Sequence, residues 1–249
     1  MIHTCFQLLI ALKPQFTSVG YFRSMFKVSR YSFVTILLVF ITSNQGFSQP
    51  ADLGNWWMYF GSKQINKKWN WHHEVQYRNY NLLGDMEQLL LRTGIGYNLT
   101  ENNNNVLLGY GFIRTEPYVA GTDEKTSFNE HRIFQQFITR QIYPHLILQH
   151  RYRIEERFVE DKDVQVRFRY FLSANIPLNK PTLAPKAFYL SVYNEIFLNA
   201  KNPVFDRNRL YGAGGYVINK HFRLELGFMR QMLPANSRNQ LQIGFYGSY

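Results

Sequence analysis

The sequence contains one cysteine, Cys5, and no apolar stretch long enough to cross a bilayer as a helix. Cys5 lies in a segment that is expected to be removed, so disulfides and thiolate chemistry are excluded from the remaining chain. The longest apolar run, from Tyr31 to Thr42, falls well short of the ~20 residues that a spanning helix needs. No segment shows helical periodicity, and no Pro-, Gly- or Ser-rich linker divides the chain, which favours a single domain without helices.

The N-terminal segment has the layout of a secretory signal peptide. Lys27 and Arg30 precede the apolar run. In the segment from Gly46 to Ser48, small residues occupy the two positions that a signal peptidase recognises. Cleavage is expected near Ser48/Gln49, so residues 1–48 are the signal peptide and residues 49–249 the exported domain. Met25 stands just ahead of the basic front, which makes it an alternative candidate for the translation start.

Acidic residues are also scarce. Removal of residues 1–48 takes away four basic residues and no acidic ones, leaving 24 basic against 17 acidic residues, a net charge of +7. Arg and Lys alternate with aromatic residues and do not gather in a stripe or arm, so a nucleic-acid partner is not expected. The excess of positive charge is better explained by an electropositive barrel interior or by contact with acidic lipid headgroups.

What the chain does have is strict alternation of apolar and polar residues. Between Trp69 and Tyr80, one face carries Trp69, Trp71, His73, Val75 and Tyr77, and the other carries Asn70, His72, Glu74, Gln76 and Arg78. Segments around 146–157, 166–175 and 222–228 repeat the pattern, and less regular ones run over 88–99, 106–116, 130–140, 188–198 and 209–218. Such segments match the ~9–11 residues of a tilted membrane-crossing strand.

The connections alternate between tight turns and mostly longer polar loops, as in outer-membrane barrels. The prediction is an all-β, antiparallel transmembrane β-barrel of 10 to 12 strands. Bacterial barrels of one chain have even strand numbers. Counting back from the C-terminus gives ten strands, and the segment from Trp56 to Phe60 is not among them. This segment is then either a periplasmic or lumenal segment or part of a twelve-stranded barrel.

The C-terminus supports the same fold. Leu241, Ile243, Phe245 and the terminal Tyr249 fall on one face of a strand, and polar residues fall on the other. A last strand that ends on an aromatic residue resembles the C-terminal signal of outer-membrane barrels. It predicts two kinds of partner: the barrel-assembly machinery, through the strand ending at Tyr249, and the outer-membrane lipids and lipopolysaccharide around the folded barrel.

Several short motifs carry a resemblance to a family. They are Asn55-Trp56-Trp57, Glu74 to Arg78, Asn129 to Arg132, His150 to Phe158, Arg167 to Tyr170, Asn194 to Phe197 and Asn208 to Tyr211. Over essentially the whole mature chain they resemble the uncharacterised family catalogued as domain of unknown function 2490. The resemblance implies a Gram-negative outer-membrane barrel and no assigned activity.

Polar residues on the inward faces are the candidate site. They form a predicted lumen cluster of Glu74, Arg78, Arg92, Arg151, Arg153, Glu155, Arg157, Arg167, Arg169, Arg223 and Glu225. Unpaired charges would be unfavourable in a narrow lumen with low-dielectric walls, so Arg–Glu pairing is expected. The cluster is interpreted as a structural salt-bridge network, or alternatively as an electropositive constriction that selects anions.

Enzymatic readings have less support. His72 and His73 are adjacent and point to opposite faces of a strand, and the other histidines are scattered, so no metal site and no cofactor are expected. A barrel hydrolase would need a serine, a histidine and an orienting group to converge. No spacing in the sequence brings Ser127, Ser173, Ser191 or Ser237 to a histidine.

The function predicted from sequence is therefore a non-enzymatic outer-membrane protein, either a narrow, porin-like channel or a structural envelope barrel. Two alternatives come from other classes. One is an outer-membrane hydrolase that acts on lipid or lipopolysaccharide, and the other is a soluble periplasmic β-barrel binder.

Overall fold

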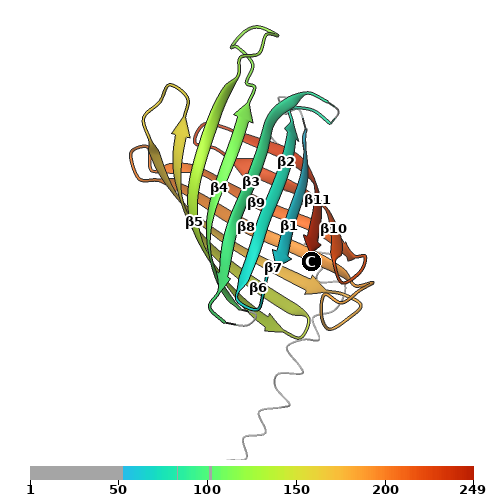
Figure 1. The fold of residues 1–249 in the computed structure, drawn as a ribbon. Helices are drawn as coiled ribbons and strands as arrows, with labels where there is room; N and C mark the ends of the chain where they lie inside the picture. The colour runs from blue at the N-terminus through green and yellow to red at the C-terminus, as the bar shows by residue number, and fades with distance from the viewer. Residues whose placement is uncertain (1–52, 83, 101–102) are drawn as a thin grey trace, which may run out of the picture. The chain divides into compact units, whose positions relative to one another are not determined.

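Eleven β-strands close into one barrel in the computed structural model (Figure 1). The structure describes residues 53–82, 84–100 and 103–249, so the expected signal peptide and its cleavage site lie outside the described residues. The strands are β1 (Gly54–Gln64), β2 (Trp69–Asn79), β3 (Met86–Asn98), β4 (Asn104–Thr115), β5 (Phe128–Tyr143), β6 (Leu146–Val159), β7 (Gln165–Pro177), β8 (Phe188–Asn199), β9 (Phe205–Val217), β10 (Phe222–Met232) and β11 (Ser237–Ser248).

The all-β prediction and the range of 10 to 12 strands are confirmed. Ten neighbouring pairs are antiparallel, and each joins strands that follow one another in sequence. The structure has neither ten strands nor twelve, because the segment around Trp56 to Phe60, left over in the even count, forms β1. It pairs in parallel with β11, with Gly54 opposite Gln240 and Ser62 opposite Ser248. This one parallel pair makes the barrel mixed, and it is what allows an odd number of strands.

The two ends of the barrel differ in their connections. We call the end with 65–68, 99–103, 144–145, 178–187 and 218–221 the turn end, and the end with 80–85, 116–127, 160–164, 200–204 and 233–236 the loop end. Strand β1 begins at the loop end, while β11 runs toward the turn end, beside the end of β1. None of the described residues forms a helix that could span a membrane.

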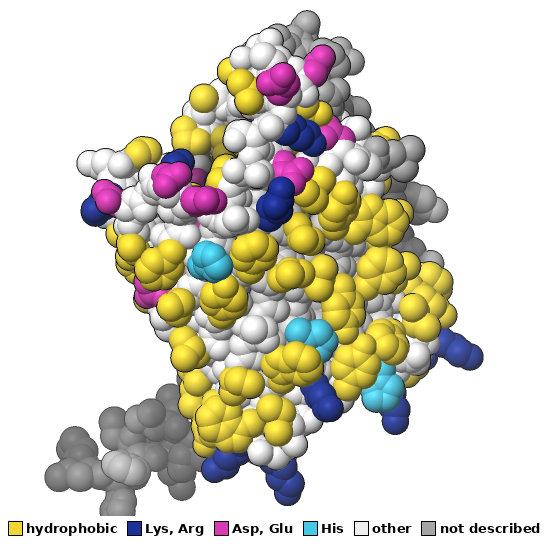
Figure 2. Space-filling model, turned by 45° about the horizontal axis from the view of Figure 1, so that its top comes forward, with side chains coloured by type: hydrophobic (Ala, Val, Ile, Leu, Met, Phe, Trp, Pro, Cys, Tyr) yellow, Lys and Arg dark blue, Asp and Glu magenta, His cyan; other side chains and the backbone are white. Residues whose placement is uncertain are grey.

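The barrel wall has an apolar outside and a polar inside. Successive strand residues point to opposite faces, and the outward set includes Leu108 and Leu226, which are 61% and 56% exposed. The inward set includes charged residues such as Glu155, which is fully buried. Figure 2 shows apolar side chains spread over the barrel wall, with acidic and basic groups at one edge and Lys and Arg at the other. Apolar side chains thus face outward along the wall and charged side chains face the lumen.

Inward side chains fill the barrel interior. Every strand contributes at least one inward residue that is buried, for example Trp56, Glu74, Leu90, Ile113, Phe134, Glu155, Arg167, Phe197, Tyr211, Met229 and Gln242 in strand order. Some reach past their neighbours. Arg209 on β9 lies over the ring of Trp56 on β1, 5.0 Å from its centroid, and the Tyr193 hydroxyl on β8 donates to Gln242 on β11 at 3.3 Å. The lumen is therefore packed across its width.

Candidate functional site

Arginine and carboxylate side chains gather inside the barrel, in the half nearer the loop end. We call this set the lumen network; it consists of Glu74, Arg78, Arg92, Glu130, Arg132, Arg151, Arg153, Glu155, Arg157, Arg167, Arg169, Glu195, Asp206, Arg207 and Arg209. Strand register brings partners together. Glu155 faces Arg167 across β6 and β7, and Glu74 faces Arg92 across β2 and β3. Opposite charges on neighbouring strands then meet at ion-pair distance.

Glu155 is the centre of the network. Arg167 Nη2 and Arg169 Nη1 donate to its two carboxylate oxygens at 2.7 and 2.5 Å, and Arg153 Nη1 approaches at 3.4 Å. The carboxylate is fully buried, so these charge-assisted bonds act where water cannot screen them. One carboxylate thus holds three guanidinium groups from β6 and β7.

Two further carboxylates extend the network. Glu195 accepts hydrogen bonds from Arg169 at 2.6 Å and from Arg151 at 2.7 Å, with Arg209 at 3.9 Å. Glu130 accepts from Arg132 and Arg157. Arg169 bridges Glu155 and Glu195, so the side chains of β6, β7 and β8 are tied together inside the wall.

Aromatic rings cover the guanidinium groups. The guanidinium carbon of Arg78 lies 3.7 Å from the Trp56 ring centroid, and that of Arg153 lies 4.4 Å from the centroid of Phe134. Cation–π contacts of this kind are stronger when desolvated. They place positive charge directly against aromatic surface inside the barrel.

A small cavity lies within the lumen network. Its volume is about 190 Å³, and its wall includes eight arginines and one carboxylate, Glu130. Gln88, Thr115, Phe128 and Phe197 complete the lining. Apart from Arg92, which is at the middle of β3, these residues stand in the halves of their strands next to the loop end, so the cavity lies toward that end.

A second polar cluster occupies the turn end. Glu225 on β10 accepts hydrogen bonds from the hydroxyls of Tyr189, Tyr246 and Tyr211 at 2.9, 3.0 and 3.4 Å. Arg223 stacks on Tyr246, with 4.4 Å between its guanidinium carbon and the ring centroid. This cluster is separate from the lumen network.

The structure divides the eleven residues of the predicted cluster between these two places. All eleven point inward. Nine belong to the lumen network, while Arg223 and Glu225 lie in the tyrosine cluster. Sequence reasoning missed the other six residues of the network: Glu130, Arg132, Glu195, Asp206, Arg207 and Arg209. Their strands alternate less regularly, but the inward run of Glu130, Arg132, Phe134 and Gln136 in β5 is a signal that could have found the first two.

Histidines do not assemble a metal or catalytic site in the described residues. No group of three or more His, Cys, Asp or Glu residues there is placed to hold a metal ion. The histidine rings bond instead to tyrosines, carbonyls or a carboxylate: His73 to Tyr59, His131 to Tyr110 and His150 to Tyr170. In that part of the chain none is hydrogen-bonded to a serine hydroxyl, so a Ser–His pair is not formed.

Comparison with family models matches residues 53–242 to a protein of unknown function (DUF2490). The match runs from just before β1 into β11 and so includes every strand. The chain belongs to the DUF2490 family. No curated protein and no solved structure matches it.

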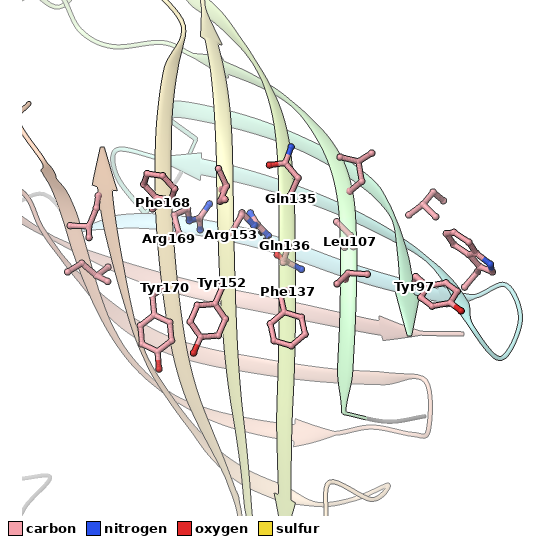
Figure 3. Close-up of a pocket in the computed structure, with 17 residues that line it drawn as sticks. Tyr97, Leu107, Gln135, Gln136, Phe137, Tyr152, Arg153, Phe168, Arg169 and Tyr170 are labelled. Carbon is pink, nitrogen blue, oxygen red and sulfur yellow. Dashed lines mark hydrogen bonds between the residues drawn. The ribbon is translucent and has the colours of Figure 1, made fainter. Parts of the chain in front are cut away.

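The outer wall of this DUF2490 barrel carries an apolar groove of about 910 Å³. A row of outward side chains on neighbouring strands lines it: Tyr97, Val106, Phe137, Tyr152, Tyr170 and Ile196. Figure 3 shows Phe137, Tyr152 and Tyr170 side by side on β5, β6 and β7. The Tyr152 and Tyr170 rings are 5.1 Å apart between centroids. An exposed apolar surface of this extent is the kind that lipid or a partner covers.

Loops at the loop end are joined by a polar contact. Lys125 in the 116–127 loop forms an ion pair with Asp85, and the Tyr118 hydroxyl donates to Asp85 at 2.8 Å. Partial burial raises the pKa of the Asp85 carboxyl, but hydrogen bonds from Lys125 and Tyr118 outweigh it, and the pKa falls below its ordinary value. The stabilisation is therefore present above the ordinary pKa of about 3.9 and is lost as pH falls through the lowered pKa.

Replacing Asp85 by asparagine is expected to loosen the 116–127 loop of the DUF2490 barrel. The substitution removes the charge that Lys125 pairs with, as protonation at low pH would. Trypsin cleavage after Lys125 should become several-fold faster at neutral pH, measured by the rate at which the cut fragments appear. Asp123→Asn, an exposed change in the same loop, is the control; equal cleavage rates in the two variants would contradict the role of the Asp85–Lys125 pair.

Proposed function

We propose that this protein is a non-enzymatic, structural barrel of the outer membrane with a lumen closed by its own side chains. The observation that carries the proposal is the burial of inward residues on every strand, together with the exposure of apolar residues outside. A barrel of this kind would have a charged interior that is blocked across its middle and an apolar outer wall. It would contribute to the envelope through its surface and its ends.

The distribution of polarity supports a membrane location. Outward residues such as Phe228 and Ile95 are about half exposed, which is unfavourable in water but favourable against hydrocarbon chains. Strands of 11 to 16 residues are long enough to cross a bilayer at a tilt. Aromatic residues sit at the turn end of the wall, where Trp69 packs edge-on against Tyr97 and Phe222 against Tyr249.

Charge at the two ends supports an orientation. The turn end carries cations in its connections and strand ends: Lys63, Lys67, Lys68, Arg140, Lys180, Lys186 and Lys220. The described loop end carries acids as well, including Asp85, Glu116, Glu160 and Asp161. Phospholipid headgroups of the periplasmic leaflet suit a cationic rim. With the turn end in the periplasm, the loops face outward toward lipopolysaccharide.

The packed interior favours the structural reading over the channel reading. A conducting pore needs a continuous water-filled path past its inward side chains. Here the middle of the lumen holds Phe134, Glu155 and Met229, all fully buried. At the loop end, Arg238 on β11 also pairs with Glu87 on β3 at 2.7 Å.

Purified protein in planar bilayers is expected to show no stepwise conductance. The side chains that cross the lumen leave no path for ions, so recordings should stay at the level of the bare bilayer. A general diffusion porin reconstituted in the same way serves as the positive control, and detergent-resistant insertion into liposomes shows that the protein is present. Regular steps from the wild-type protein would support the channel reading instead.

The other classes remain distinguishable by experiment. A lipid or lipopolysaccharide hydrolase would alter envelope lipids, so mass spectrometry of envelopes with and without the protein separates it from a structural barrel. A soluble periplasmic binder would stay in the supernatant on membrane fractionation. The strand that ends at Tyr249 is paired with β10 and β1 along its length, so assembly machinery would have to read it before closure.

A further inference from the structure

Positive charge inside the barrel exceeds negative charge. The cavity in the lumen network is lined by Arg78, Arg92, Arg132, Arg157, Arg167, Arg169, Arg207 and Arg209 and by one carboxylate, Glu130. Across the whole network, ten arginines share five carboxylates. Guanidinium groups stay protonated in proteins. Buried charge without a counter-charge is strongly unfavourable, so the surplus calls for anions from outside the chain.

Two arginines at the cavity have donors to spare. Arg78 is buried and bonds to the amide oxygens of Gln76 and Gln88, with no carboxylate partner in the part of the chain that the structure describes. The Nε of Arg92 is buried and has no hydrogen-bond partner among the described groups. Both residues line the cavity. Their unused charge and donors point to a ligand that accepts hydrogen bonds.

We propose that this cavity binds one small oxyanion of the phosphate class. Phosphate offers several oxygens to guanidinium forks that converge from different strands, and Arg is the side chain best suited to that geometry. The cavity has a volume of about 190 Å³, which is room for a single small oxyanion together with water molecules.

The position of the cavity indicates whether the phosphate comes from solution or from a lipid headgroup. Its lining residues face inward near the loop end, on the opposite side of the wall from lipid. Arg207, whose side chain is 26% exposed, is the most open of the ion-paired arginines around it. A free phosphate can enter from the loop end, while a headgroup in the surrounding bilayer would have to pass through the wall. The ligand is therefore a dissolved phosphate. Binding does not depend on whether the barrel conducts.

Binding can be measured on the purified full-length protein in detergent, after exhaustive dialysis into phosphate-free buffer. Inorganic phosphate is titrated in an isothermal calorimeter. The expected result is saturable binding of one phosphate per chain, weakened by added salt because the contact is electrostatic. Failure of this binding would leave the conductance result unaffected, so the two proposals fail separately.

Arg78→Gln tests the site. Arg78 pairs with no carboxylate among the described residues, so the substitution leaves none of these carboxylates unpaired, and the variant should fold. Its phosphate affinity should fall at least about tenfold, the factor that corresponds to about 1.4 kcal/mol. Arg223→Gln removes an inward arginine from the tyrosine cluster at the turn end and is the matched control, with unchanged affinity. Circular dichroism and the shift in gel mobility on heating show that both variants form the barrel.

Three outcomes would overturn the proposal. The first is the absence of saturable binding of inorganic phosphate, and the second is equal loss of affinity in Arg78→Gln and Arg223→Gln. The third concerns the source: the protein is also incubated with vesicles that contain phosphatidic acid and compared with vesicles of phosphatidylcholine alone. Binding of phosphatidic acid vesicles without binding of free phosphate would assign the phosphate chemistry to a lipid-facing surface instead of the cavity.

Discussion

Replacing Glu155 by glutamine is expected to lower the free energy of unfolding by about 3 to 5 kcal/mol. The carboxylate is fully buried and holds Arg153, Arg167 and Arg169, so loss of its charge leaves three buried guanidinium groups with a weaker partner. The arginine surplus of the lumen network also grows by one. The measurement is urea-induced unfolding of the liposome-inserted protein, followed by tryptophan fluorescence.

Glu156→Gln is the matched control for this prediction. Glu156 is the next residue along β6, points outward, and makes a single hydrogen bond with Gln135 at 3.2 Å. Its substitution should change stability by no more than about 0.5 kcal/mol. If the two variants unfolded at the same urea concentration, Glu155 would not be the centre of the network.

Replacing Gly109 by leucine is expected to prevent the barrel from closing normally. Gly109 on β4 faces Phe134 on β5, and a Cβ at position 109 would lie 2.2 Å from Cζ of that ring. The ring is fully buried and lies under Arg153, so it has no space to move into. Overpacking of this kind typically destabilises by about 1–3 kcal/mol and more where nothing can shift. The folded fraction, read from heat-modified gel mobility, should drop sharply.

Two further variants make that result specific. The double variant Gly109→Leu/Phe134→Ala removes the ring that the leucine would overlap, so most of the folded fraction should be recovered. Gly212→Leu places the same side chain on the outer face of β9, where a Cβ meets nothing within 4 Å, and should fold as the wild type does. Equal folding of Gly109→Leu and Gly212→Leu would mean that the interior is not packed as described.

Local alternation was enough to predict most of the wall. The faces expected for Trp69 to Tyr80 are those observed, because one face of a strand in a barrel wall is apolar along its whole length. The segment around Trp56 to Phe60 lacks that signal: Trp56 and Met58 point inward and Trp57 points outward, so apolar residues occupy both faces. Its pairing with β11 depends on residues far away in sequence, which no local pattern encodes.

The site was predictable as a set of inward charges, but its pairings were not. Alternation places Arg167 and Arg169 inside, yet only the register between β6 and β7 brings both to Glu155. The cavity depends on the register of further strands, because Arg78 and Arg209 reach it from β2 and β9. Glu195 was missed for the same reason: its partners lie on β6, β7 and β9, and its own strand alternates weakly.

An odd number of strands has a topological consequence. The first and last strands run in the same direction, so β1 starts with Gly54 at the loop end and β11 finishes at the turn end. Each hairpin can form between strands that are adjacent in sequence. The parallel pairing of β1 with β11, in which Gly54 lies opposite Gln240, can form only when both ends of the barrel domain are present. Closure of the barrel is then the last step of its folding and the one with the largest cost in chain entropy.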